Sequence, residues 1–307
     1  MPPLSPAEIF HQNPPLRFLE TLEPLDAAAA ERGFRLEHIS PSLGTVVHGI
    51  DLRTLPDSAT HAFLYDLLVQ RKVIFFRDQD LTPEQHIGFS RLFGELEVHP
   101  FIENRDGYPE IVVLRADEKS PPIGTDVWHS DVSWRPEPSL GSVLIAREAP
   151  PTGGDTCWAN MEAAYEGLDE ETKKRIDGRF ALHDSHLFRF GMRARGASDE
   201  EIEQYQKEHP ISRHPIVRTH PDTGRKSLYV NAVFTLGIED LGEEESNALL
   251  RRLCATATRI EYQCRFRWQK NSIAFWDNRA AQHYAVSDYF PARRHMERVT
   301  IVGDRPY

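Results

Sequence analysis

The chain has 307 residues, 40% of them hydrophobic, which is enough to bury a large core in one domain or two small ones. Its formal charge of -11 disfavours a nucleic-acid partner, because an acidic surface repels phosphate backbones. A mean hydropathy of -0.50 and the lack of a long apolar run exclude a transmembrane helix, so we expect no membrane partner.

The expected location is the cytoplasm. The N-terminal stretch MPPLSPAEIF has no basic segment followed by an apolar one, so no secretory signal is visible. Cys157, Cys254 and Cys264 lie at scattered spacings that indicate neither a disulfide framework nor a zinc site. Both observations favour a reducing compartment.

The first 32 residues are rich in proline and alanine, and we expect them to form a partly helical N-terminal arm outside the core. Apolar residues at helical spacing predict a helix over 60–71, followed by a strand in the run KVIFF that ends near Arg77. The sequence Thr82-Pro83-Glu84-Gln85 is typical of a capping box, which predicts a helix from there to about Phe93.

The rest of the chain predicts short strands interrupted by helices. Strands are expected at 110–114, 142–146, 179–183, 227–231, 264–268, 272–276 and 298–302, with helices near 159–177 and 242–257. This pattern favours an antiparallel barrel or jelly roll over a doubly wound sheet. No glycine-rich dinucleotide or P-loop motif follows a strand.

Three residues are candidate metal ligands: His129 and Asp131 in WHSDVSW, and His283 in WDNRAAQHY. Two imidazoles and one carboxylate on one face of Fe(II) leave coordination positions open for a bidentate co-substrate and O₂. The spacing of two residues between His129 and Asp131 points both side chains to the same side of a strand. The third metal ligand, a histidine, can come from any segment that the fold brings close to this pair.

This spacing alone is a weak signal, because roughly two His-x-Asp/Glu triplets are expected by chance in a chain with 14 histidines and 47 acidic residues. Two others exist, at His220 and at His295, and solvated side chains are the alternative explanation for all three. We expect His220 to lie in an exposed loop, and His295 lies among arginines that would repel a cation. The flanking tryptophans and Val132 give His129 the apolar surroundings that protect a reactive metal.

Two arginines, Arg294 and Arg298, lie four residues apart and therefore share a strand face, about 13 Å from one another. A guanidinium binds a carboxylate through two parallel hydrogen bonds, which suits a dicarboxylate co-substrate. Surface ion pairs with Asp288 and Glu297 are the alternative explanation.

Several longer motifs resemble the taurine dioxygenase family, the TauD/TfdA group of Fe(II)/2-oxoglutarate oxygenases. They are the C-terminal run WDNRAAQHYAVSDYFPARRHMERVTIVGDRPY, WHSDVSW, PPTGGDT, FGELEVHP, VIFFRDQDLTPEQH and HPIVRTHPDTGRKSLYVN. They occur in the family's order, and the resemblance extends from about Gly33 to the end of the chain. It implies one dioxygenase domain over 33–307, with a mainly β fold with α insertions: a double-stranded β-helix (jelly roll, cupin-like).

The resemblance also implies roles for individual residues. His129, Asp131 and His283 would bind Fe(II), whereas Thr156 and Arg294 would hold the co-substrate 2-oxoglutarate. The implied substrate residues are His99, Arg298, Phe234 and Val132. The reaction would consume O₂, release succinate and CO₂, and hydroxylate a small anionic substrate, in the first place a sulfonate or sulfate ester.

The chain departs from the family where the substrate would lie. The tyrosine expected after the HP motif is replaced by Phe101 and Ile102, and the segment before Trp128 lacks the family's asparagine. The stretch DSHLFRF after His183 offers no clear counterpart of a second substrate phenylalanine. These departures argue against taurine itself.

Several alternatives stay open at this point. The same chemistry could act on a carboxylate such as an aryloxyalkanoate. A jelly-roll binding protein without catalysis and a zinc hydrolase with the same three ligands are the others. Family members commonly self-associate, so a homo-oligomer, a dimer or a tetramer, is expected.

Overall fold

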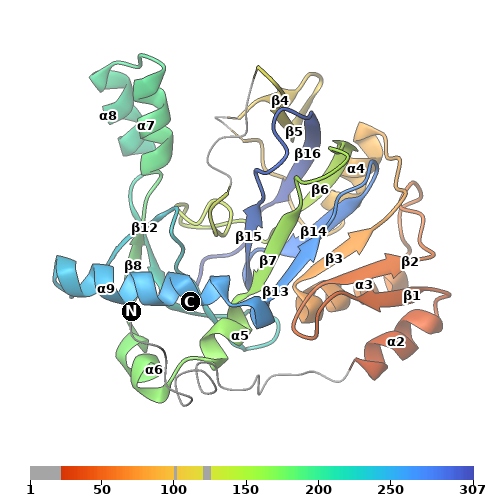
Figure 1. The fold of residues 1–307 in the computed structure, drawn as a ribbon, viewed down its shortest axis with the longest axis horizontal. Helices are drawn as coiled ribbons and strands as arrows, with labels where there is room; N and C mark the ends of the chain where they lie inside the picture. Colours follow the sequence, from red (N-terminus) through yellow and green to blue (C-terminus); the bar gives the residue numbers. More distant parts are fainter. Residues whose placement is uncertain (1–21, 100–101, 120–125) are drawn as a thin grey trace, which may run out of the picture.

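The fold is built on an eight-stranded sheet (Figure 1), and the computed structural model describes residues 22–99, 102–119 and 126–307. In spatial order the strands are β1 (Arg35–His38), β2 (Thr45–His48), β3 (Val73–Phe76), β14 (Ile273–Asp277), β6 (Gly141–Glu148), β16 (Arg294–Ile301), β5 (Tyr108–Ala116) and β4 (Asn104–Arg105). Only the pair β2–β3 is parallel. Strands from both ends of the chain therefore meet in the centre of this sheet.

The central strands of the large sheet, β3, β14 and β6, are buried on both faces, which explains their continuous apolar runs. Along β14, Ile273 and Phe275 point to one face, whereas Ala274 and Trp276 point to the other. The first face packs against three helices: α2 (Glu23–Ala30), α3 (Ser58–Arg71) and α4 (Pro83–Arg91). Side chains therefore alternate between two separate apolar clusters along one strand.

The described part of the expected N-terminal arm does pack on the core, which corrects the expectation that it lies outside. Leu25 and Ala29 of α2 are 4% and 0% exposed and belong to the cluster beneath the helices. They point inward because they lie four residues apart on one face of the helix. Residues 1–21 lie outside the described part of the chain, and the domain boundary at residue 33 stays a prediction.

A second sheet packs against the other face of the large one. It consists of β13 (Gln263–Phe266), β7 (Thr156–Asn160) and β15 (Ala281–Ala285), all antiparallel. The cluster between the two sheets contains Phe75, Trp158, Phe266 and Trp276, with Phe75 stacked on Phe266 at a ring-centroid distance of 4.0 Å. The fold is thus mainly β with helices, and the site residues lie at the end of this two-sheet core.

Most of the remaining elements lie between β7 and β13 in the sequence. They are α5 (Met161–Glu166), α6 (Glu170–Ile176), β8 (Phe180–His183), α7 (His186–Ala194), α8 (Asp199–Glu208), β9 (Ser212–Pro215), β10 (Val217–Thr219), β11 (Lys226–Leu228), β12 (Thr235–Ile238), α9 (Glu243–Ala255) and two short 3₁₀ turns, Thr256–Thr258 and Ile260–Tyr262. Except for α7, α8 and β9, these elements surround a third apolar cluster. Figure 1 shows α7 and α8 projecting away from the two sheets.

The strongest local predictions are confirmed. Helix α3 begins after Asp57, whose side chain accepts the N–H of Thr60, and α4 has the predicted capping box between Thr82 and Gln85. A strand or part of one occurs in each predicted strand segment, and α9 matches the predicted helix near 242–257. The strands β7 and β15 and the helices α7 and α8 were not predicted. No helix in the described ranges has the length and apolarity needed to cross a bilayer.

We expect Phe75→Ala to lower the free energy of unfolding by about 3–5 kcal/mol, because the ring is fully buried and its removal leaves a cavity. Phe190→Ala is the matched control, since that ring is 72% exposed, and its effect should stay within about 0.5 kcal/mol. Urea unfolding followed by circular dichroism measures both. Equal losses would contradict the assignment of Phe75 to the core between the sheets.

Candidate metal centre

The backbone around the first two candidate ligands is held by a single bridge rather than by a strand. The N–H of His129 donates to the carbonyl of His283 at 3.1 Å, and the N–H of His283 donates back at 2.8 Å. Beyond this bridge the chain turns, and Val132 has a positive φ of 46°. The prediction of a strand carrying His129 and Asp131 is therefore wrong, although both side chains still face one point.

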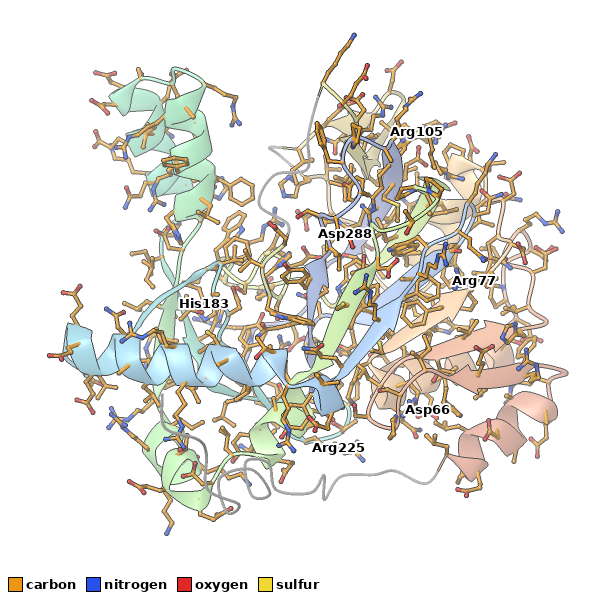
Figure 2. All side chains as sticks on the ribbon, viewed as in Figure 1. Asp66, Arg77, Arg105, His183, Arg225 and Asp288 are labelled. Carbon is orange, nitrogen blue, oxygen red and sulfur yellow. The ribbon has the colours of Figure 1, made fainter. Side chains whose placement is uncertain are left out.

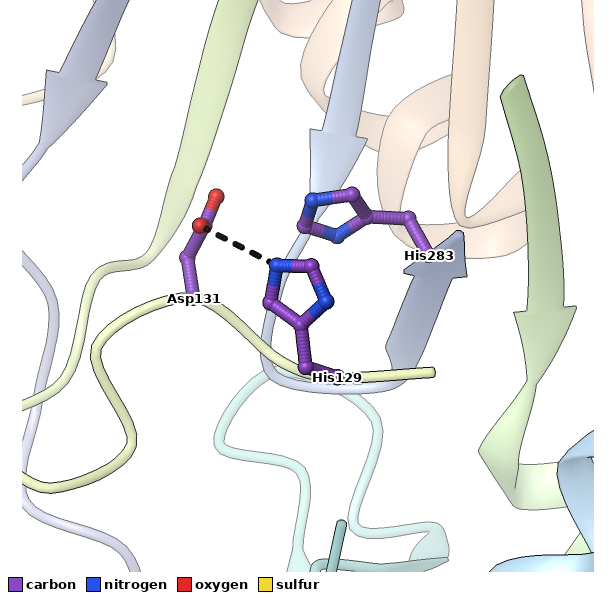
Figure 3. A group of neighbouring side chains, drawn as sticks. All are labelled: His129, Asp131 and His283. Carbon is purple, nitrogen blue, oxygen red and sulfur yellow. Dashed lines mark ion pairs between the residues drawn. The ribbon is translucent and has the colours of Figure 1, made fainter. Parts of the chain in front are cut away.

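The side chains of His129, Asp131 and His283 converge (Figure 3). One ligand atom from each lies within 4.8 Å of the others, and Nε2 of His129 is 3.9 Å from Oδ1 of Asp131. Two atoms bound to one transition-metal ion at about 2.1 Å lie no more than about 4.2 Å apart, so this separation fits a shared ion. Among the described residues, no other group of three His, Cys, Asp or Glu side chains meets in this way.

The partners of these side chains also fit a metal. Nδ1 of His129 lies 2.7 Å from the carbonyl of Val127, which can only accept, so Nδ1 donates and Nε2 of the neutral ring keeps its lone pair. Oδ2 of Asp131 and Nδ1 of His283 are buried and have no hydrogen-bond partner. Buried polar atoms without a partner are costly, and a cation shared by these side chains would offset that cost.

The charge state of the site also suits metal binding. Burial alone would raise the pKa of Asp131, but the Arg298 guanidinium and the two imidazoles outweigh it and lower that pKa to about 2. Burial, together with His129, lowers the pKa of His283 to about 3. At neutral pH the site therefore presents an ionised carboxylate and a neutral His283 imidazole, the forms that bind metal.

The two residues expected to hold 2-oxoglutarate begin strands of the two packed sheets, and Arg294 contacts Gly154, two residues before Thr156. Thr156 begins β7 and accepts a hydrogen bond from the indole of Trp268 at 2.9 Å. Arg294 begins β16, and its Nε donates to the carbonyl of Gly154 at 3.2 Å. Gly154 has a φ of +68°, and a side chain there would press on Pro150 and Tyr289.

The surroundings of Gly154 also settle the alternative explanation for the arginines. Asp288, which Figure 2 labels, accepts the N–H of Gly154 at 2.8 Å rather than pairing with Arg294. Glu297 pairs with Arg105 and Arg147, at 2.6 and 2.7 Å. Surface ion pairs with Asp288 and Glu297 therefore do not explain Arg294 and Arg298, both of which are buried.

His99 and Arg298 form the polar side of the site. Nη1 of Arg298 donates to Oδ1 of Asp131 at 2.8 Å, which was not expected from the sequence. Burial, with Arg298 and Arg135, lowers the pKa of His99 to about 3. The Nδ1 atom of His99 accepts the N–H of Ile102 at 3.2 Å, so the neutral ring carries its proton on Nε2.

An apolar wall lies near His129. Phe234, Val132, Trp134 and Val233 form one small buried cluster, and the Phe234 ring centroid is 6.4 Å from that of His129. Phe188 packs against this cluster, 6.1 Å from the His99 ring. The motif DSHLFRF contains Phe188, but its position in α7 depends on a helix that the sequence did not predict. Phe101 and residues 124–125, where the sequence departs from the family, lie outside the described ranges.

The other two His-x-Asp/Glu triplets are not metal sites. The turn at residues 221–224 is exposed as expected, but His220 itself is fully buried and its Nε2 lies 2.9 Å from Oδ2 of Asp277. A buried contact with Asp277 beneath the turn, rather than solvent, satisfies Nε2 of this imidazole. His295 lies 3.9 Å from Glu297, whose carboxylate is already shared by two arginines.

Comparisons with known proteins agree with this geometry. The model of the family described as "Taurine catabolism dioxygenase TauD, TfdA family" matches residues 35–300. An alkylsulfatase of Acinetobacter baylyi is 34% identical over 280 residues, covering 88% of this chain and 85% of the relative. An alpha-ketoglutarate-dependent sulfate ester dioxygenase of Pseudomonas putida is 33% identical, with coverages of 87% and 89%. The crystal structure of a taurine dioxygenase from Burkholderia xenovorans matches with a TM-score of 0.76, 35% identity, and coverages of 89% and 90%.

We expect Arg298→Gln to raise the pKa of His99 from about 3 toward its ordinary value, because one of the positive charges that lower it is removed. A titration of histidine-labelled, metal-free protein by NMR measures this. Arg293→Gln is the control, since it removes the same charge from a side chain that is 72% exposed. If the two variants leave the pKa of His99 equally unchanged, the electrostatic coupling between Arg298 and His99 is absent.

Proposed function

The chain belongs to the taurine catabolism dioxygenase TauD, TfdA family, and on that premise we propose that it oxidises a small sulfate ester or sulfonate. It is an Fe(II)- and 2-oxoglutarate-dependent dioxygenase that uses O₂. The observation that carries the proposal is the convergence of three metal-binding side chains beside a buried arginine. Two relatives, one named an alkylsulfatase and one named a sulfate ester dioxygenase, support the substrate class.

His129, Asp131 and His283 are the proposed Fe(II) ligands. When bound, the ion supplies the redox chemistry that couples oxidative decarboxylation of 2-oxoglutarate, to succinate and CO₂, to oxidation of the substrate. The protein fixes the ligands: the carbonyl of Val127 orients His129, and Arg298 holds Oδ1 of Asp131. These contacts keep the ligand set rigid and buried.

We assign the far carboxylate of 2-oxoglutarate to Arg294 and Thr156. The bond from Nε to the Gly154 carbonyl sets the plane of the Arg294 guanidinium, whose two terminal nitrogens then form a fork. Thr156 lies two residues beyond Gly154, and its hydroxyl oxygen accepts from Trp268, which directs its proton to another acceptor. A carboxylate between the two would receive charge-assisted hydrogen bonds in a buried setting.

The anionic head group of the substrate is assigned to Arg298 and His99, and its organic part to the wall formed by Phe234 and Val132. A sulfate ester or sulfonate carries one negative charge, which one guanidinium balances, and the Nε2 proton of neutral His99 adds a donor. Hydroxylation of the carbon next to the ester oxygen gives a product that collapses to an aldehyde and hydrogen sulfate. Oxygen is consumed in equal amount to 2-oxoglutarate.

The alternatives differ in what they require. A carboxylate such as an aryloxyalkanoate fits the same charge balance and stays the second candidate. A binding protein without catalysis would not need an intact ligand set, and a zinc hydrolase would not need Arg294 beside Thr156. Neither explains both features together.

We also infer that the two packed sheets form the double-stranded β-helix, which their antiparallel pairing and shared core support. The three cysteines, all within the described residues, are unpaired, which supports a cytoplasmic location. The dimer or tetramer stays a prediction.

A substrate panel tests the proposed function. We expect 2-oxoglutarate- and Fe(II)-dependent succinate release with an alkyl sulfate or an alkyl sulfonate above the rate without substrate, and less release with an aryloxyacetate. His283→Ala should abolish release, because it removes one of three ligands. Release with the aryloxyacetate alone would favour the second candidate, and no release with any member would contradict the substrate class.

Arg294 and Arg298 should have separable effects. We expect Arg294→Ala to raise the apparent KM for 2-oxoglutarate and Arg298→Ala to raise that for the sulfate ester, each about 10- to 100-fold from a lost charge-assisted hydrogen bond. Steady-state titrations with each ligand measure both. Identical profiles in the two variants would refute this division.

A further inference from the structure

The turn between β14 and β15 is buried in its entirety. It comprises Asn278, Arg279 and Ala280 and follows Asp277, the last residue of β14, and none of these four residues is more than 3% accessible. A polar turn is normally found at the surface, because its backbone groups need water. Here the polar groups are satisfied by other parts of the chain, and their partners show what the turn holds in place.

The side chain of Asn278 binds the backbone of the proposed metal ligand Asp131. Its Oδ1 accepts the N–H of Asp131 at 2.7 Å, and its Nδ2 donates to the carbonyl of Asp131 at 2.9 Å. The same Nδ2 lies 3.0 Å from Oγ and 3.3 Å from the carbonyl of Ser139. An amide offers both an acceptor and two donors, which neither a carboxylate nor an apolar side chain does.

These bonds take the place of the backbone hydrogen bonds that a neighbouring strand would provide. Asp131 lies just past the bridge between His129 and His283, at the start of a turn, so no neighbouring strand pairs with its backbone. The next residue, Val132, has a positive φ that a β-branched side chain rarely adopts. Without Asn278, two buried backbone groups of Asp131 would lose the partners that fix the direction of its carboxylate.

The turn itself is held rigidly. Both carboxylate oxygens of Asp277 are bound by Arg279, at 2.9 and 2.8 Å, and Nε2 of His220 lies 2.9 Å from Oδ2. The N–H of Asn278 donates to the carbonyl of Leu140 at 2.8 Å. Beyond the turn, β15 carries His283, whose backbone pairs with His129. One buried turn thus contacts the segments that carry all three ligands.

We propose that Asn278 is a positioning residue for the metal centre: its side-chain amide sets the backbone of Asp131, and thereby the direction of the carboxylate toward the two imidazoles. The inference rests on the proposed function, because it concerns the same metal site. It predicts that Asn278 determines metal affinity without touching the ion, whereas a buried asparagine elsewhere does not.

Asn160 provides the matched control. It is also 0% exposed, accepts from the backbone N–H groups of Glu162 and Ala163, both at 3.0 Å, and donates to the carbonyl of Ser42 at 2.8 Å. Its removal leaves the same kind of unsatisfied backbone groups, at the start of α5 rather than at the metal centre. A loss of stability should therefore be common to both variants, and a loss of metal affinity should not.

The experiment titrates the full-length protein with Mn(II) and follows the free ion by electron paramagnetic resonance, at a temperature where each variant is folded by circular dichroism. We expect Asn278→Ala and Asn278→Asp to bind Mn(II) about 10- to 100-fold more weakly than wild type, and Asn160→Ala to bind it as wild type does. Asn278→Asp keeps the shape and the acceptor for the N–H of Asp131, and decides the matter if Asn278→Ala does not fold.

Mn(II) affinities of the Asn278 variants within twofold of wild type would overturn the positioning role and leave the proposed function intact. An equal loss of Mn(II) affinity in Asn160→Ala would also overturn the positioning role, because the loss would then follow protein stability alone. Absence of Mn(II) binding by the wild-type protein would overturn the metal site and this inference together.

Discussion

The site depends on one short backbone pairing, the bridge between His129 and His283. Its two hydrogen bonds bring together segments that are more than 150 residues apart in the sequence, and they form an isolated bridge at the edge strand β15. A slip of one residue would turn one imidazole to the opposite side of the chain. Everything proposed about the metal centre follows from this register, with Asp131 held beside it by Asn278 and Arg298.

The electrostatics of the site oppose those of the whole molecule. With a net charge of -11, the protein repels small anions at long range, yet its proposed co-substrate and substrate are both anionic. The buried arginines Arg294 and Arg298 resolve this conflict locally, because a guanidinium shielded from water attracts an anion more strongly than the diffuse surface charge repels it. Arg298 also holds Asp131 ionised, so it links the anion site to the metal ligands.

The residues of this candidate site could be predicted from the sequence more completely than the structure that supports them. Ligand types, the arginine pair and the capping box of α4 are visible because each depends on residues close together in the chain. The resemblance to a family added Thr156 and supported His283 as the third ligand, which spacing alone could not connect to the other two. The buried state of His220 and the turn at Asp131 could not be predicted, because both depend on Asp277 and Asn278, which lie far away in sequence. Phe188 was missed for the same reason, since its place depends on how α7 packs.

The most direct test of the account is an anaerobic crystal structure of the protein soaked with Mn(II) and 2-oxoglutarate, with the metal located by its anomalous scattering. The account predicts one strong peak bonded to a nitrogen of His129, a nitrogen of His283 and a carboxylate oxygen of Asp131, with the far carboxylate of 2-oxoglutarate against Arg294. A peak elsewhere in the molecule, or one that lacks any of these three protein ligands, would contradict it.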